Sequence, residues 1–182
     1  GNKMIKHFLS ITDLTAKEIW QVFALAKKQN KPVLKGESLA MIFEKPSLRT
    51  RVSFEAGMTQ LGGHAIYLGP ADIQMGKRET PGDIARNLER MVDIIMARVF
   101  EHEKLLELSR GTKIPVINGL SDLEHPCQAL ADIFPVFEKK KKLSNLKLSY
   151  VGDAESNVTH SLALLCQTLG IKFLNHLIYR WI

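Results

Sequence analysis

The sequence predicts an α/β fold, in which a parallel sheet flanked by helices is followed by an incomplete second α/β domain. Short apolar runs alternate along the chain with segments of helical periodicity, which is the pattern of parallel strand–helix–strand units. The 182 residues are 45% hydrophobic, which is enough for a substantial core. After a lysine-rich stretch, residues 145–182 are too few for an independent core of their own.

The first elements are a helix and then a strand–helix unit. A helix is expected over residues 15–30, because Thr15 and Glu18 form the signature of a capping box and apolar residues follow at helical spacing. The apolar run at 39–43 predicts a strand. A polar loop follows it, and residues 51–61 then predict a helix that ends at two glycines.

The same alternation continues to residue 169. It predicts further strands over residues 64–68, 93–98, 114–117 and 147–151. It predicts further helices opening at Thr80 and Pro81, over 101–110, over Pro126–Lys140 with a bend at Pro135, and over 156–169. The repeated order of strand and helix favours a parallel sheet.

A domain boundary is expected near residue 144, where a long helix runs into a lysine cluster and a short polar turn before a new strand begins. This division assigns residues 1–144 to a first domain and 145–182 to the start of a truncated second domain. The second part has room for one strand–helix unit and part of another strand. The lysines at 139–142 are interpreted as a solvated helix end that the helix dipole favours.

Composition excludes several classes of protein. No apolar stretch approaches the roughly 20 residues that a membrane span needs, and no export signal is visible. Cys127 and Cys166 have neither the number nor the spacing of a disulfide framework or a zinc site, so we expect a cytoplasmic protein without a metal. The net charge of +6 suits an anionic partner but does not by itself identify one.

The loop that precedes the helix at 51–61 has the composition of an anion-binding site. Arg49 and Arg51 lie at a helix N-terminus, where each opposes the dipole by a few tenths to about 1 kcal/mol unless an anion lies between them. The hydroxyls of Ser47 and Thr50 and the free N–H groups of the helix start add donors that suit phosphate or carboxylate. The sequence is equally consistent with arginines that pair with nearby glutamates on an ordinary capped helix.

Further polar residues follow other predicted strands. Arg98 ends the strand at 93–98, and His125 and Gln128 open the helix after the strand at 114–117. Open α/β sheets bind ligands at the carboxyl ends of their strands. A lone histidine is more often a structural or capping residue, and a strand-terminal arginine is more often a surface charge. Their shared position at strand ends raises the odds of a common site.

Two motifs in this chain resemble the aspartate/ornithine carbamoyltransferase family, and most closely its ornithine-specific members. The first reads Phe-Glu-Lys-Pro-Ser-Leu-Arg-Thr-Arg-Val-Ser-Phe-Glu over residues 43–55, and the second reads His-Pro-Cys-Gln-Ala-Leu-Ala-Asp over 125–132. Residues 67–70, Gln74, Lys77 and 152–157 extend the resemblance over nearly the whole chain. Leu48 departs from the common Ser-Thr-Arg-Thr-Arg form, at a position expected to offer mainly its backbone N–H.

The resemblance implies a carbamoyl phosphate site and no metal or organic cofactor. The residues implied to hold carbamoyl phosphate are Ser47, Leu48, Arg49, Thr50, Gln74, Arg98, His125 and Gln128. Among them, Thr50, Arg98 and His125 are implied to act in catalysis, because donors there would stabilise the charge that develops on the carbamoyl oxygen. Asn157 matches a position that contacts the amino-acid substrate, although it also fits a helix cap.

The implied activity is transfer of the carbamoyl group to the side-chain amine of L-ornithine, giving L-citrulline and phosphate in arginine biosynthesis or catabolism. A homotrimer is implied, because in the family the loop that carries Gln74 reaches into the neighbouring subunit's site. The family's later ornithine-binding segments are not present in this sequence. Two alternatives follow: a catalytically incompetent fragment that binds carbamoyl phosphate, or a carbamoyltransferase with another amine acceptor. Nucleic-acid binding rests on charge alone and is not expected.

Overall fold

The computed structural model describes residues 6–28 and 31–177. Its strands are β1 (Ser38–Phe43), β2 (His64–Leu68), β3 (Ile94–Arg98), β4 (Val116–Leu120), β5 (Lys147–Gly152) and β6 (Lys172–Leu177). Its helices are η1 (Ile11–Asp13), α1 (Ala16–Lys27), α2 (Leu48–Gln60), α3 (Pro70–Ile73), α4 (Pro81–Leu88), α5 (His102–Arg110), α6 (Pro126–Lys140) and α7 (Asn157–Leu169).

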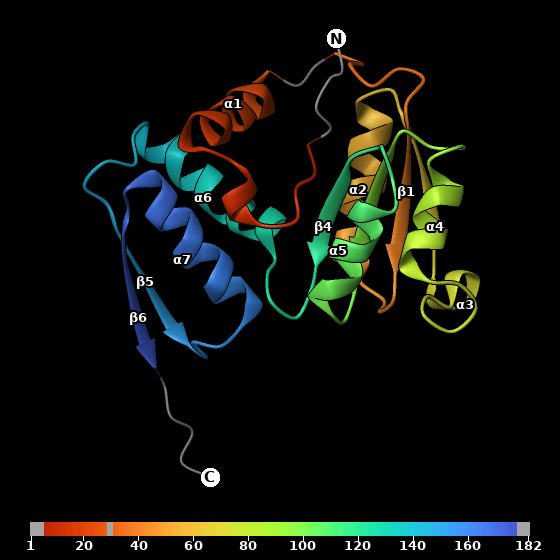
Figure 1. Ribbon diagram of the computed structural model, residues 1–182. Coiled ribbons are helices and arrows are strands. Elements are labelled where there is room, and N and C mark those ends of the chain that lie inside the picture. The colour runs from red at the N-terminus through yellow and green to blue at the C-terminus, as the bar shows by residue number, and fades with distance from the viewer. Residues whose placement is uncertain (1–5, 29–30, 178–182) are drawn as a thin grey trace.

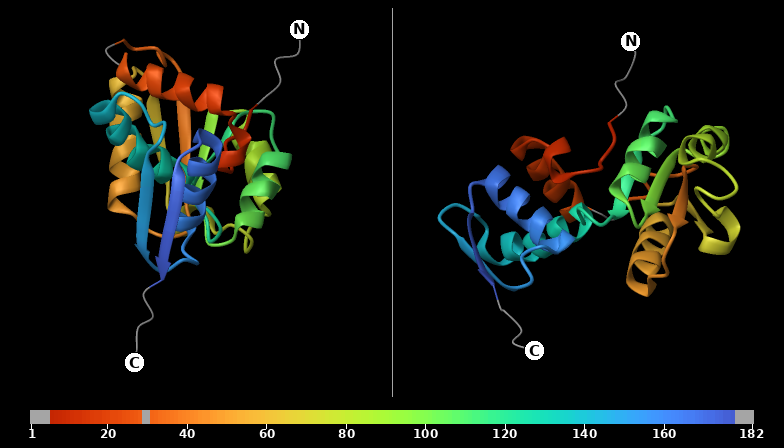
Figure 2. Two further views of the ribbon diagram at one scale, coloured as in Figure 1. Left: turned by 90° about the vertical axis from the view of Figure 1, so that its left-hand side faces the viewer. Right: turned by 60° about the horizontal axis from the view of Figure 1, so that its bottom comes forward.

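Four of the strands form one parallel sheet in the order β2-β1-β3-β4. The central strand β1 is apolar along nearly its whole length, as expected for a strand that is covered on both faces. Leu39, Met41 and Phe43 pack toward α2, whereas Ala40 and Ile42 pack toward α4 and α5. Helices therefore cover both faces of this sheet (Figures 1 and 2). The predicted α/β class with a parallel sheet is confirmed.

The rest of the chain forms a second group of elements. Strands β5 and β6 pair in parallel, and α7 connects them and packs against α6. Figure 1 shows α1, α6 and α7 grouped with this small sheet, on the opposite side of the molecule from α2 and α4. Its buried cluster joins residues from the two ends of the sequence, including Ile19 and Phe23 of α1 with Leu162 and Leu165 of α7.

Several element boundaries differ from the sequence prediction. Helix α2 begins at Leu48, three residues earlier than expected, because the Ser47 side chain caps it. Strand β4 runs to Leu120 rather than ending at 117. Phe8 lies beside it and exchanges backbone hydrogen bonds with Val116 and Asn118.

Among the short or late elements, one helix differs from the sequence prediction. The short helix α3 was not predicted; its N-terminal N–H, on Gly69, donates to the Asp72 side chain at 2.8 Å. Helix α6 has the predicted bounds and contains Pro135. Strand β6 is the part of a further strand for which the sequence leaves room after the β5–α7 unit. Residues 178–182 lie outside the described residues.

Candidate functional site

A cavity of about 510 Å³ lies at the carboxyl ends of β3 and β4, where the helices α2, α6 and α7 begin. Its walls come from the N-terminal turns of α2, α6 and α7 and from the ends of β3 and β4. The lining residues are Ser47, Arg49, Thr50, Ser53, Phe54, Arg98, Leu120, His125, Cys127, Gln128, Ala131 and Val158. The carboxyl edge of a parallel sheet is the usual place for a ligand in this fold class.

The first turn of α2 forms one wall of this cavity. Ser47 is its N-cap: the Ser47 hydroxyl donates to Thr50 Oγ1 at 3.0 Å and accepts from the Thr50 N–H at 3.4 Å. The leading N–H groups of an α-helix have no partner within the helix, and the helix dipole adds partial positive charge there. This wall is therefore suited to an anion.

Arg98 forms the adjoining wall from the end of β3. Its Nη1 donates to Thr50 Oγ1 at 3.4 Å, while its Nε is buried and has no hydrogen-bond partner within residues 6–28 and 31–177. Burial and the neighbouring charge of Arg49 lower the pKa of Arg98. Over the same part of the chain, neither arginine makes a salt bridge to a carboxylate. An anionic ligand would satisfy both.

His125 faces the cavity from the N-cap of α6. Burial, reinforced by the positive charges of Arg98 and Lys45, lowers the pKa of His125 to about 4. The imidazole is therefore neutral at pH 7, so one ring nitrogen carries a proton and can donate it to a carbonyl oxygen. Its Nδ1 is buried and finds no hydrogen-bond partner among the described residues.

The structure separates the two interpretations of the arginines near α2. Arg51 pairs with Glu55 at 3.3 Å and lies over the Tyr67 ring, 3.9 Å from its centroid. This is the ordinary helix pairing that the sequence left open. Arg49 instead lines the cavity, and Glu44, the other candidate partner, pairs with Lys104 at 2.8 Å.

The start of α6 adds two more side chains to the cavity. The Gln128 amide donates to Asp132 at 2.8 Å, which leaves its carbonyl oxygen available. The Cys127 thiol donates to the Asn118 carbonyl at 3.4 Å, and burial raises the pKa of this thiol to about 12. Cys127 is therefore not a thiolate nucleophile at neutral pH.

Three of the predicted site residues do not contribute side chains to this cavity. The Leu48 side chain is 79% exposed and is not among the lining residues, which leaves only the backbone of that residue at the start of α2. Asn157 donates its side-chain amide to the Ser121 carbonyl at 2.7 Å. Gln74 lies in a different cavity of the same chain.

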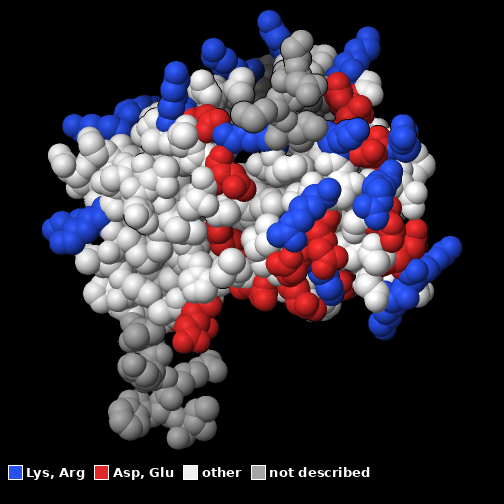
Figure 3. All heavy atoms as spheres, in the orientation of Figure 1, with Lys and Arg blue, Asp and Glu red and all other residues white. Residues whose placement is uncertain are grey.

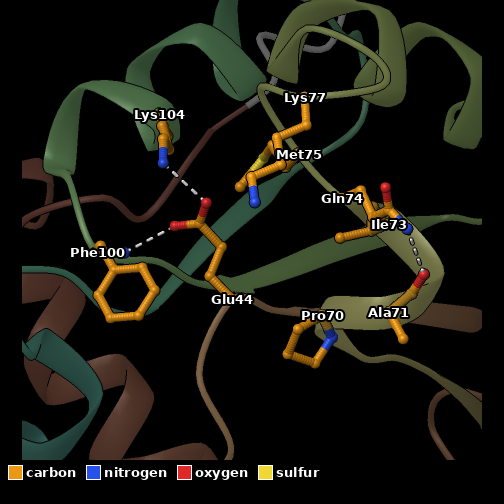
Figure 4. A pocket seen from close by; sticks show the side chains of 9 residues that line it. All are labelled: Glu44, Pro70, Ala71, Ile73, Gln74, Met75, Lys77, Phe100 and Lys104. Carbon is orange, nitrogen blue, oxygen red and sulfur yellow. Dashed lines mark hydrogen bonds and ion pairs between the residues drawn. The ribbon is translucent and has the colours of Figure 1, made fainter.

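The cavity that contains Gln74 has a volume of about 610 Å³ (Figure 4). Gln74 follows α3 with a left-handed backbone, φ 40°, and its side-chain amide is 3.5 Å from the Ala71 carbonyl. Figure 4 shows Glu44 between Lys104 and the Phe100 backbone N–H, each at 2.8 Å. Within one chain, Gln74 is thus not placed with Arg49 and His125.

Sequence reasoning missed six of the residues that line the site: Ser53, Phe54, Leu120, Cys127, Ala131 and Val158. Ser53 and Phe54 lie one helical turn after Arg49 and Thr50, so helical periodicity alone could have found them. Ala131 likewise lies one turn after Gln128. Leu120 and Val158 had no such signal, because the first depends on where β4 ends and the second on how α7 packs.

Charge on the molecular surface is mixed. On the face drawn in Figure 3, basic side chains alternate with acidic ones over the side that holds α4 and α5, and most of the surface over α7 is uncharged. No helix in the described part of the chain is long and apolar enough to cross a membrane. The same residues contain no group of three or more His, Cys, Asp or Glu side chains that could hold a metal ion.

The chain is similar to carbamoyltransferases over most of its length. The family described as aspartate/ornithine carbamoyltransferase, carbamoyl-P binding domain, matches residues 6–138. Ornithine carbamoyltransferase from Anoxybacillus flavithermus is 52% identical over 174 residues, which are 91% of this chain and 55% of the relative. The Bacillus subtilis enzyme of the same name is 52% identical over 169 residues, or 91% and 53% of the two chains.

Solved structures agree with these relatives. The ornithine carbamoyltransferase from Pyrococcus furiosus superposes with a TM-score of 0.91 at 45% identity, covering 97% of this chain and 59% of that one. The Thermus thermophilus structure gives 0.90 at 40% identity, covering 98% and 64%. The chain spans about half the length of the curated relatives that it matches.

Proposed function

The chain belongs to the aspartate/ornithine carbamoyltransferase family, and we propose that it binds carbamoyl phosphate in the cavity between α2, β3 and α6. The observation that carries this proposal is a set of donors without protein acceptors. Arg49 and Arg98 have no carboxylate partner in the described chain, and Arg98 Nε and His125 Nδ1 are buried without hydrogen bonds there. An anionic ligand in the cavity would give both guanidinium groups an acceptor.

The phosphate end is proposed to bind at the start of α2. The Ser47 and Thr50 hydroxyls, the Leu48 N–H and the Arg49 guanidinium together offer neutral and charged donors to its oxygens. The helix dipole adds to this attraction. Arg49 also neutralises charge on the phosphate as it leaves.

The carbamoyl group is proposed to bind between Arg98, His125 and Gln128. An amine attacks the carbamoyl carbon, the bond from that carbon to the phosphate oxygen breaks, and phosphate leaves with the electron pair and takes up the proton that the amine loses. Thr50, Arg98 and neutral His125 donate to the oxygen on which negative charge develops, which is where fixed donors lower a barrier most. No metal or organic cofactor takes part in this scheme.

The proposed acceptor is the side-chain amine of L-ornithine, which would give L-citrulline in arginine biosynthesis or catabolism. This choice of acceptor is supported by a sequence identity of about 50% with ornithine carbamoyltransferases. Asn157 at the start of α7 is the proposed contact to the acceptor. Because the chain spans about half of those relatives, binding of carbamoyl phosphate without turnover, or transfer to another amine, stays as the alternative.

Two further proposals concern organisation. We place the boundary between domains at residue 144, with the four-stranded sheet in 1–144 and the β5–α7–β6 unit in 145–182.

We also propose a cytoplasmic homotrimer in which Gln74 of one copy reaches the carbamoyl phosphate of the next, since Gln74 does not line that cavity in its own chain. Sedimentation velocity at several concentrations tests the trimer.

Calorimetric titration with carbamoyl phosphate, paired with a citrulline assay on the same sample, tests the function. Binding together with citrulline formation supports the complete transfer reaction with ornithine as acceptor. Binding without citrulline supports the carbamoyl-phosphate site and removes ornithine transfer for this chain. No binding removes the site assignment.

A further inference from the structure

The ring of His125 is not held in place by its own hydrogen bonds within the described chain. Its Nδ1 is buried and lacks a partner there, so the position of the imidazole depends on its packing and on the main chain from which it projects. That main chain is irregular: His125 is the N-cap of α6, with φ −133° and ψ 69°. Its carbonyl accepts from the N–H groups of Gln128 and Ala129, at 3.1 and 3.2 Å.

The backbone N–H of His125 is bound by a residue from a distant part of the chain. The His125 N–H donates to Ser161 Oγ at 2.9 Å. Ser161 lies on α7, 36 residues later, and is completely buried. The same helix contributes Val158 to the cavity wall, so α7 both borders the site and anchors its histidine.

The direction of the Ser161 hydroxyl is defined by Glu124. The hydroxyl donates its single proton to Glu124 Oε2 at 3.0 Å, and this carboxylate also accepts from the Ile11 N–H at 3.2 Å. Glu124 is only 3% exposed, and burial of a carboxyl group is costly unless hydrogen bonds compensate it. A carboxylate accepts but does not donate, so it draws the Ser161 proton toward itself and leaves the serine lone pairs facing the His125 N–H.

We propose that Ser161, oriented by Glu124, is a positioning residue that holds His125 against the carbamoyl group. This inference rests on the proposed function, because it assigns His125 to the carbamoyl end of the ligand. Ser161 itself touches no substrate. Its effect is confined to the part of the ligand that His125 contacts, and the phosphate end at α2 does not depend on it.

Because only the carbamoyl end of the ligand depends on Ser161, the ratio of the affinities for carbamoyl phosphate and for inorganic phosphate tests the proposal. Carbamoyl phosphate and inorganic phosphate are titrated by calorimetry into the wild-type chain, Ser161→Ala, Ser161→Thr and the control Ser109→Ala. The control also loses a serine hydroxyl that bonds to main chain, but on α5, where Ser109 donates to Leu106 at 2.8 Å. In Ser161→Ala we expect the preference for carbamoyl phosphate over phosphate to fall about tenfold, the value of one well-placed hydrogen bond.

The outcomes separate this inference from the function on which it rests. A wild-type chain that shows no preference for carbamoyl phosphate overturns the assigned role of His125 and the inference with it. A wild-type preference that Ser161→Ala retains overturns the inference alone, even if the melting temperature falls. Recovery of the preference in Ser161→Thr, which keeps the hydroxyl, supports the positioning role, as does an unchanged preference in Ser109→Ala.

A second measurement needs no variant and so does not depend on whether Ser161→Ala folds. N–H groups at the start of a helix normally exchange quickly, because they lack a partner within the helix. The His125 amide is expected to exchange with solvent at least tenfold more slowly than the exposed Glu101 amide at the N-cap of α5. Equally fast exchange at the two positions overturns the anchoring contact.

Discussion

Arg98 Nη1 lies 3.4 Å from Thr50 Oγ1, which joins the end of β3 to the first turn of α2. Parallel pairing of β1 with β3 sets Arg98 opposite Phe43, and the short loop after Phe43 carries Thr50 to the same edge. Thr50 Oγ1 also accepts a hydrogen bond from the Ser47 hydroxyl. The two halves of the proposed site, the anion wall and the carbamoyl wall, are thus in direct contact before any ligand binds.

Arg49 and Arg51 form a matched pair for testing the phosphate wall. Arg49→Ala should weaken carbamoyl phosphate binding about ten- to a hundredfold, because it removes a charge-assisted donor from the cavity. Arg51→Ala should change the affinity less than threefold, because Arg51 already pairs with Glu55 on the exposed side of α2. Calorimetric titration measures both. Equal losses in the two variants would contradict the placement of Arg49.

The low pKa of His125 predicts a dependence of stability on pH. The folded state holds this pKa at about 4, below the ordinary value of 6.5, so between these pH values the unfolded chain binds more protons than the folded chain. The free energy of unfolding should therefore decrease as pH falls from 6.5 toward 4. Urea unfolding at several pH values measures it. The decrease should be smaller in His125→Asn, and an identical decrease in both proteins would refute the assignment to His125.

Phe23 should stabilise both α1 and the distant helix α7. It is 2% exposed and packs in the cluster that contains Leu162 and Leu165, with Phe137 stacked 5.9 Å away. Phe23→Ala should lower the free energy of unfolding by about 3 to 5 kcal/mol, the usual cost of emptying an aromatic core position. Hydrogen exchange should accelerate in α7 as well as in α1. Leu25→Ala, on the exposed face of the same helix, should change stability by less than about 0.5 kcal/mol.

Both described thiols should react slowly in the native chain. Burial raises the pKa of Cys127 to about 12 and that of Cys166 to about 11, so little thiolate is present at pH 8. A colorimetric disulfide reagent should label neither cysteine quickly in buffer and both in concentrated urea. Fast native labelling of Cys127, located by mass spectrometry, would show a reactive thiolate in the cavity and contradict its assignment as a thiol that donates to the Asn118 carbonyl.

Much of the architecture was predictable because it depends on local chemistry. Periodicity located the strands from β1 to β5, and capping residues such as Thr15 located the helix starts. Ser47 is a cap of the same kind that the sequence reading overlooked, so α2 was expected three residues too late. Helix α3 has only four residues, which is too short for periodicity to detect.

The sequence by itself determined the fold class, the donor-rich composition of residues 47–50 and the presence of Arg98 and His125 at strand and helix ends. Local spacing and parallel topology are sufficient for these, since parallel strands end at one edge. Only the tertiary structure decided which arginine faces the cavity, because Arg49 and Arg51 differ only in their direction from α2 and in the partner that Glu55 provides. It also decided that Ser161 anchors His125 and that α1 packs on α7, since contacts between residues far apart in the sequence follow from the packing of whole elements.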